Sequence, residues 1–170
     1  MNRSSLICLA ATCLTLAASV AGCATKRVYI SGTRVPYTPN NKQLLDAVEQ
    51  YRLAVERGDA EGLMLMANKQ YWEDSGTPSG SDDYGYDGLR NVLMNRLSKA
   101  TDIRYSLRYM AVTQECKTLQ VGCKATVDIL IDASFTIANV NGKANRPDKR
   151  DQNQLFLEWD GKRWSFLSGM

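Results

Sequence analysis

Cys23 stands in a pattern that is typical of an exported protein. A short positive start at residues 1–3 precedes an apolar run at residues 6–20, and the small residues Ala21 and Gly22 come directly before the cysteine. This order of charged start, apolar run and small residues at a processing site is typical of a secretory signal peptide. We therefore predict that residues 1–22 are a signal peptide.

The residues Val20-Ala21-Gly22-Cys23 resemble a bacterial lipobox. The resemblance implies cleavage after Gly22, a diacylglycerol on the Cys23 thiol and a further acyl chain (palmitate or similar) on its new amino group. Because Ala24 is not the aspartate that retains lipoproteins at the inner membrane, it also implies the outer membrane, facing the periplasm. Two alternatives stay open: a membrane-spanning helix, which needs about 20 apolar residues, and ordinary secretory cleavage within residues 17–21.

Cys116 and Cys123 are the two cysteines of the part that follows the predicted lipid site. An even pair in an exported protein is most simply a disulfide, which would pinch the loop between two strands. A redox role is the alternative, although the chain has no Cys-x-x-Cys motif and no histidine beside the pair.

The chain contains no histidine, which excludes histidine-based zinc sites, Ser-His hydrolases and Cys-His nucleophiles. No glycine-rich phosphate loop follows a strand, so we predict neither a cofactor nor a metal. Without residues 1–22, 20 basic and 18 acidic residues remain, a net charge of +2. The basic residues are scattered, and the one enrichment, at 143–150, is interrupted by Pro147 and Asp148. A nucleic-acid partner is therefore not expected.

Residues 23–40 mix charges, glycine and prolines without a sustained period and are predicted to be a tether, with a short edge strand around Val28. From Asn41 the pattern becomes helical, because apolar residues recur at spacings of four, three and four until Gly58, a C-terminal cap. Asp59 is a predicted N-cap of a second helix. After a polar loop at 75–83, Asp87 is a predicted N-cap of a third.

The period changes to two after Ala100, which predicts strands with one wet face. Alternation runs through residues 103–109 and again, over a longer stretch, through residues 127–137. Asp160-Gly161, between Trp159 and Trp164, predicts a two-residue hairpin turn between the last two strands. Helices followed by hairpin-connected strands make an α+β domain over residues 41–170.

The same region resembles the nuclear transport factor 2-like fold, the cone-shaped family that includes ketosteroid isomerases and polyketide cyclases. The resemblance covers roughly residues 42–166. It rests on residues 47–63, which look like the family's first helix, Gly-Asp turn and second helix, on Tyr71-Trp72-Glu73-Asp74 and on Gly88-Leu89. It implies three N-terminal helices packed on a curved antiparallel sheet, with room for a pocket between them.

Residue by residue, the resemblance to ketosteroid isomerases places Tyr51 at the position of an oxyanion-hole phenol and Asp74 at that of the proton-shuttling carboxylate. Such a carboxylate removes a proton beside a carbonyl, and the phenol donates to the enolate oxygen. The third partner departs from the pattern. Where those isomerases carry a protonated acid on a late strand, this chain offers Asn153, Gln154 or Leu155, with Leu155 the best alignment.

Structural roles compete with these assignments. Tyr51 lies on the apolar stripe of its helix and could be a core residue with a satisfied hydroxyl. Asp74 could shape the turn into the following loop. Asp128 and Asp132 share one strand face, where they could form a carboxylate pair at a cavity mouth or pair in solvent with neighbours such as Arg104 or Arg108.

We expect a membrane-anchored lipoprotein whose cone domain binds a small apolar ligand or an envelope protein without catalysing a reaction. The alternatives are an isomerase- or cyclase-type enzyme that uses Asp74 with Tyr51, and a structural subunit that forms a homodimer through its sheet. Exposed Trp159, Trp164 or Phe166 would favour assembly, and pocket-facing aromatic residues would favour a ligand.

Overall fold

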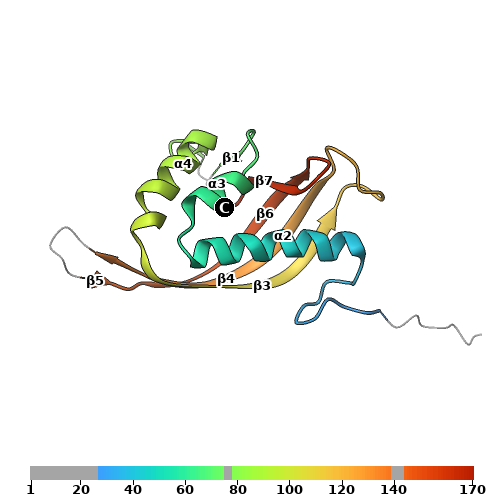
Figure 1. Cartoon of the computed structure of the whole chain (residues 1–170), viewed down its shortest axis with the longest axis horizontal. Helices are drawn as coiled ribbons and strands as arrows, with labels where there is room; N and C mark the ends of the chain where they lie inside the picture. The colour runs from blue at the N-terminus through green and yellow to red at the C-terminus, as the bar shows by residue number, and fades with distance from the viewer. Residues whose placement is uncertain (1–26, 75–77, 139–143) are drawn as a thin grey trace, which may run out of the picture.

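Three helices cover one face of a curved antiparallel sheet in the computed structural model of the chain (Figure 1). The structure describes residues 27–74, 78–138 and 144–170, so the predicted signal peptide and Cys23 lie outside the described residues. The helices come first and the long strands follow, which confirms the predicted α+β layout. No helix in this described part is long and apolar enough to cross a membrane.

The first helix, α2 (Pro39–Glu56), begins two residues earlier than predicted. The Thr38 side chain accepts a hydrogen bond from the Asn41 N–H, and Pro39 occupies the first turn, where its missing N–H costs no helical hydrogen bond. The helix ends as predicted, with Gly58 at a φ of 66° directly after the C-cap.

The second and third helices are α3 (Ala60–Met66) and α4 (Tyr86–Asn95), and a short 3-10 helix, η1 (Leu97–Lys99), follows. Asp59 caps α3 as predicted by accepting the Gly62 N–H at 2.8 Å. The predicted cap of α4 is wrong: Gly85 is its N-cap and Asp87 lies inside the first turn. A carboxylate in the first turn still interacts favourably with the positive end of the helix dipole, so the same residue type fits both positions.

The sheet has the order β3 (Thr101–Gln114), β4 (Lys124–Ala138), β6 (Asp148–Trp159) and β7 (Trp164–Ser168), all antiparallel. A short strand, β5 (Ala144–Asn145), pairs with the far end of β4. The predicted alternation is confirmed in β3, where the side chains at 103, 105, 107 and 109 face the helices and those at 104, 106 and 108 are exposed.

Two connections differ from the prediction. Trp159 and Trp164 are partners in the register, so the turn between β6 and β7 spans the four residues 160–163 rather than two. The turn closes because one Asp160 carboxylate oxygen accepts the N–H groups of Lys162 and Arg163. A two-stranded hairpin, β1 (Trp72–Glu73) with β2 (Tyr84–Gly85), lies where no strand was predicted.

The hydrophobic core lies between the helices and the inner sheet face. Its fully buried side chains come from Val35 and from α2, α3, α4, β4, β6 and β7, and the largest are Leu44, Leu63, Leu89, Ile129, Leu155, Leu157 and Phe166. Every member of the buried cluster lies between Val35 and Phe166. A chain that begins at Thr25 therefore retains the whole core.

Residues 28–37, which are part of the predicted tether, fold back onto the domain. Tyr29 and Pro36 form a bridge, and the Ile30 N–H donates to the Val35 carbonyl at 2.9 Å. The Val35 side chain is 1% exposed. Burial of this apolar side chain holds the segment in place. The charges and prolines around it give no local signal for such burial.

Cys116 and Cys123 form a disulfide with 5.9 Å between their Cα atoms. The bridge closes the loop between β3 and β4, as the residues predicted. The Cys123 side chain is buried, and the Trp159 N–H donates to the Cys123 carbonyl, so the loop is also tied to the end of β6.

Candidate functional site

Tyr51 is buried in the core, with its hydroxyl 3.1 Å from the Tyr105 hydroxyl. Its ring lies 5.2 Å from that of Phe166, centroid to centroid. Burial raises the pKa of Tyr51 well above its usual value, and the neighbouring Tyr105 adds to the effect. Tyr51 is thus a neutral phenol whose hydroxyl already has a protein partner.

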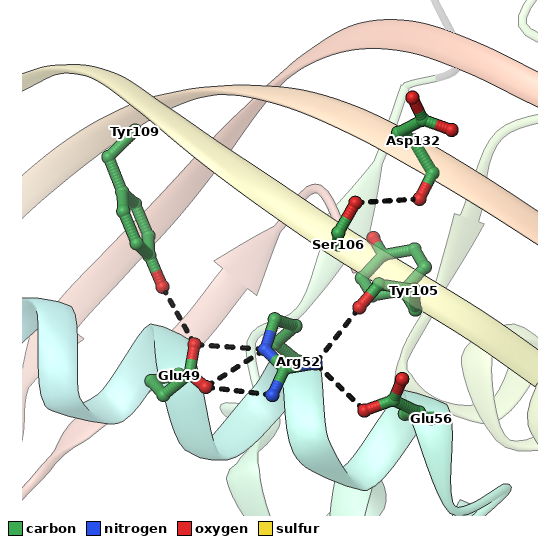
Figure 2. A network of polar contacts seen from close by, with 7 residues as sticks. All are labelled: Glu49, Arg52, Glu56, Tyr105, Ser106, Tyr109 and Asp132. Atoms are coloured by element: carbon green, nitrogen blue, oxygen red, sulfur yellow. Dashed lines mark hydrogen bonds and ion pairs between the residues drawn. The ribbon is translucent and has the colours of Figure 1, made fainter. Parts of the chain in front are cut away.

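A polar network on α2 fixes the helix against β3 (Figure 2). The Arg52 guanidinium pairs with Glu49 and Glu56 at 2.8 Å each and also donates to the Tyr105 carbonyl at 3.0 Å. The Tyr109 hydroxyl donates to Glu49 at 3.2 Å. Because these contacts hold α2 at the edge of β3, they also set the position of Tyr51, the residue before Arg52.

Glu73, the neighbour of Asp74, is a carboxylate that the fold holds in a defined position. One Glu73 oxygen accepts the Tyr71 hydroxyl at 2.8 Å and the Gly169 N–H at 2.7 Å. The Tyr71 hydroxyl in turn accepts the Met170 N–H at 3.1 Å, and the Tyr71 ring stacks on Tyr84. Burial and then the Glu73 charge raise the pKa of Tyr71 strongly.

An open groove of about 640 Å³ lies between β1 and β6. We call it the β1–β6 groove. Its walls combine two exposed aromatic side chains with carboxylates, amides and one hydroxyl, namely Trp72, Glu73, Asp74, Gln152, Asn153, Gln154, Phe156 and Ser168. Such a mixture offers a flat apolar surface beside several hydrogen-bonding groups.

The structure brings some of the predicted site residues together and separates others. Asp74 is exposed and lines the β1–β6 groove together with Asn153 and Gln154. Leu155, the best-aligned third partner, is fully buried in the core. Tyr51 is not among the groove-lining residues.

The groove runs beside an edge of β6 that β7 does not cover, because the pairing of β6 with β7 is confined to residues 156–159. Two N–H groups on this stretch are satisfied locally: Asp151 accepts the Gln152 N–H and Asn153 accepts the Gln154 N–H. Edge strands that are protected by their own side chains are poor templates for a further strand. The groove is therefore better suited to a small molecule than to strand addition.

A second groove, of about 380 Å³, lies between α2, α3 and the β6–β7 hairpin. Trp159, Trp164 and Phe166 all contribute to its walls, and the two indole rings meet edge to face. Trp164 and Phe166 are buried and Trp159 is half-buried, so these aromatic residues face inward rather than outward from the sheet.

Asp128 and Asp132 lie on the outer face of β4, and the side chains of Val127 and Ile129 lie on its inner face. Asp128 accepts the Gln154 amide at 2.6 Å, and Asp132 pairs with Arg150 at 2.8 Å. Their partners therefore come from β6 rather than from the expected arginines of β3. In the described residues no group of three acidic, cysteine or histidine side chains is placed to hold a metal ion.

Sequence reasoning missed Tyr71, Glu73 and Gly169 as a connected group. The two-residue strand β1 is too short to show a period, and the partner of Glu73 is 96 residues away. Tyr105 could have been found, since it occupies an inward position in the alternation of β3.

No protein-family profile and no curated protein sequence matches this chain. Solved structures do. A ketosteroid isomerase-like protein from Erwinia carotovora atroseptica superimposes with a TM-score of 0.57 at 16% identity, over 77% of this chain and 93% of that one. A protein of the nuclear transport factor 2-like family from Streptomyces avermitilis gives 0.53 at 14% identity, over 76% and 92%.

A conserved protein from Planctomyces limnophilus gives a TM-score of 0.58 at 7% identity, over 77% of this chain and 98% of that one. At such identities the likeness concerns the fold alone. Together with the three helices on an antiparallel sheet, it shows that the described part of the chain adopts the cone-like fold of nuclear transport factor 2-like proteins.

Proposed function

We propose that this protein is a lipid-anchored envelope protein whose cone domain binds a small ligand in the β1–β6 groove without transforming it. The observation that carries the proposal is the composition of that groove. The Trp72 side chain is 56% exposed and Phe156 is 41% exposed, and both stand beside carboxylate and amide groups. Exposed aromatic faces next to convergent polar groups are typical of ligand sites.

The chemistry of the walls favours a ligand with hydroxyl or amine donors and one flat apolar face. The carboxylates of Glu73 and Asp74 can accept hydrogen bonds, and the amides of Gln152 and Asn153 can both donate and accept. This differs from the small apolar ligand that we expected from the sequence, because the polar side chains of the groove walls favour a ligand that forms hydrogen bonds.

Binding is favoured over proton transfer by the positions of Tyr51 and Asp74. An enzyme of the ketosteroid isomerase type needs the phenol and the carboxylate at one ligand. Here the Tyr51 hydroxyl is buried against Tyr105, and Asp74 is exposed at the groove. The role of Asp74 in this proposal is to bind, not to move a proton.

The aromatic residues of the β6–β7 hairpin also support a binding protein rather than an assembly subunit. Trp164 and Phe166 are buried, and all three aromatic side chains of this region line the second groove. The outer face of the sheet carries exposed Arg104 and Arg108 and the Asp132–Arg150 pair. Charged residues are depleted in the cores of protein interfaces, so this face favours solvent over a homodimer contact.

The anchor is proposed to be the acylated Cys23, with the domain held at the periplasmic face of the outer membrane. Two or three acyl chains on one residue would keep the protein on a bilayer essentially permanently. Cys23→Ser should release the protein from the membrane fraction. Retention of this variant in the membrane fraction after a salt wash would contradict acylation at this residue.

Ligand binding is tested by a thermal-shift screen of the domain against small polyols, amines and glycosides, followed by titration of the compounds that stabilise it. Trp72→Ala should abolish the shift. Tyr37→Ala is the matched control, since the Tyr37 side chain is similarly exposed at 55% but lies outside the groove. Equal shifts in the two variants would exclude the β1–β6 groove as the site.

A further inference from the structure

The segment that follows Cys23 is short, which brings one end of the folded domain close to the proposed anchor. An extended chain spans at most about 3.6 Å per residue, so Val28 lies within about 18 Å of Cys23. Residues 28–37 are already folded onto the domain by the Tyr29–Pro36 bridge and by the burial of Val35. If Cys23 is held at a bilayer, this hairpin must therefore lie near the bilayer surface.

The hairpin and the disulfide loop are at the same end of the molecule (Figure 1). The Pro36 carbonyl accepts the Asn41 amide, and the Asn41 side-chain oxygen accepts the Gln114 amide, each at 2.9 Å. Gln114 ends β3, and the loop closed by the disulfide begins two residues later at Cys116. We call this end, residues 27–38 with the loop 116–123 and Lys162, the tether-side face.

Large apolar side chains are exposed on the tether-side face. Val28 is 66% exposed and Val121 is 72% exposed, and Tyr29 and Tyr37 are also exposed. The Gly122 N–H donates to the Trp159 carbonyl, so the loop that carries Val121 is held beside the β6–β7 hairpin and Lys162. Tyrosine is enriched where proteins meet the headgroup region, because its ring is apolar and its hydroxyl is polar.

The charges of this face are mainly positive. Residues 27–38 contain Arg27 and Arg34 and no acidic residue, and the disulfide loop contributes Lys117. These three cations and Lys162 are exposed and form no ion pair within the described residues. Asp160, the acidic neighbour of Lys162, is engaged by the N–H groups of its own turn, and these lower its pKa.

We propose that the tether-side face docks on the surface of an anionic phospholipid bilayer, with Val28, Tyr37 and Val121 entering the interface and the cations contacting headgroups. Exposed apolar side chains flanked by unpaired cations match the two interactions that bind peripheral proteins to membranes. This inference rests on the proposed anchoring for its orientation. Docking would stop the domain from tumbling freely on its tether. It would fix the orientation of the β1–β6 groove and of the outer sheet face relative to the bilayer.

The test is vesicle co-sedimentation of the unacylated domain, Thr25–Met170, which retains the whole core. The domain should bind phosphatidylethanolamine vesicles that contain phosphatidylglycerol, and it should bind phosphatidylcholine vesicles much more weakly. Each of Arg34→Glu and Lys117→Glu should weaken binding by at least about fivefold, because the loss of one basic residue near an anionic surface costs about that much and the new carboxylate is repelled by the headgroups. Val121→Ser should also weaken it, and raised salt should reverse the charge-dependent part.

Two matched controls separate docking from general surface properties. Arg104→Glu reverses an exposed cation on the outer sheet face, and Leu65→Ser removes an exposed apolar side chain on α3. Both should bind like the wild type, with circular dichroism confirming that every variant is folded. Absence of wild-type binding to anionic vesicles, or equal losses in the controls, would overturn the proposal. Because no acylated protein is used, that result would leave anchoring through Cys23 to be judged by its own test.

Discussion

The Glu73 carboxylate accepts the backbone N–H of Gly169 at 2.7 Å and so joins β1 to the residue that follows β7. The same oxygen accepts the Tyr71 hydroxyl. A carboxylate that takes two donors inside a half-buried cluster is a fixed structural element. Glu73 therefore holds β1 in place as one wall of the β1–β6 groove, and the exposed Trp72 side chain belongs to the same strand.

Glu73→Ala should lower the free energy of unfolding by about 2 to 3 kcal/mol, because it removes two hydrogen bonds to a charged acceptor. The Tyr71 hydroxyl and the Gly169 N–H would be left without this partner. Urea denaturation at neutral pH measures the change. Glu115→Ala, at an exposed carboxylate, is the control and should stay within about 0.5 kcal/mol of wild type. Similar stability of the two variants would contradict a structural role for Glu73.

Gly169 has a φ of 88°, and a Cβ at this position would collide with the Gln154 backbone. Gly169→Ala should therefore cost about 2 to 4 kcal/mol, the sum of left-handed strain and lost close packing. Gly122→Ala is a matched control, because Gly122 has a φ of 81° but no atom within 4 Å of the added Cβ. It should cost only about 1 to 2 kcal/mol. Equal costs in urea titrations would show that Gly169 does not approach β6 closely.

Because of Tyr51, the free energy of unfolding should decrease as the pH rises above about 10. Both the folded and the unfolded states keep the phenol protonated below about pH 10, the ordinary pKa of tyrosine. Above that pH the unfolded state loses the proton, while the raised pKa of buried Tyr51 keeps it on the folded state. Stability should then fall by about 1.4 kcal/mol per pH unit for this residue until the folded pKa is reached. Tyr51→Phe should make the alkaline decline shallower by that amount, and an unchanged slope would contradict the assignment.

The disulfide between Cys116 and Cys123 closes a loop with a sequence separation of 7. The chain-entropy relation gives about 2.5 kcal/mol for a loop of this size. Replacement of both cysteines by serine should lower the free energy of unfolding by about this amount, and reductant should have no further effect on the double variant. A wild-type protein whose urea midpoint does not respond to reductant would argue against the bridge.

The sequence predicts the parts of this fold that repeat a pattern over several residues. The apolar stripe of α2, the Gly58 cap and the alternation of β3 are local signals, and the structure confirms them. The inward position of Tyr51 followed from that stripe, although its partner Tyr105 lies 54 residues away in the chain.

The remaining features depend on contacts that no local pattern reveals. β1 has two residues, and Glu73 is held by Gly169 from the other end of the domain. The resemblance points to Asp74 and gives no signal for its neighbour Glu73, whose contacts with Tyr71 and Gly169 depend on the folded chain. The hairpin at 28–37 has no local signal for a similar reason, since the buried Val35 and half-buried Ile30 side chains hold it to a core that comes from the rest of the chain.

Native mass spectrometry of the domain, Thr25–Met170, purified from the periplasm without denaturation, tests the central claim most directly. We predict a bound small molecule of defined mass on the wild-type domain and on Tyr37→Ala, and its loss from Trp72→Ala. A wild-type domain that carries no molecule, or an adduct that persists in Trp72→Ala, would contradict ligand binding in the β1–β6 groove.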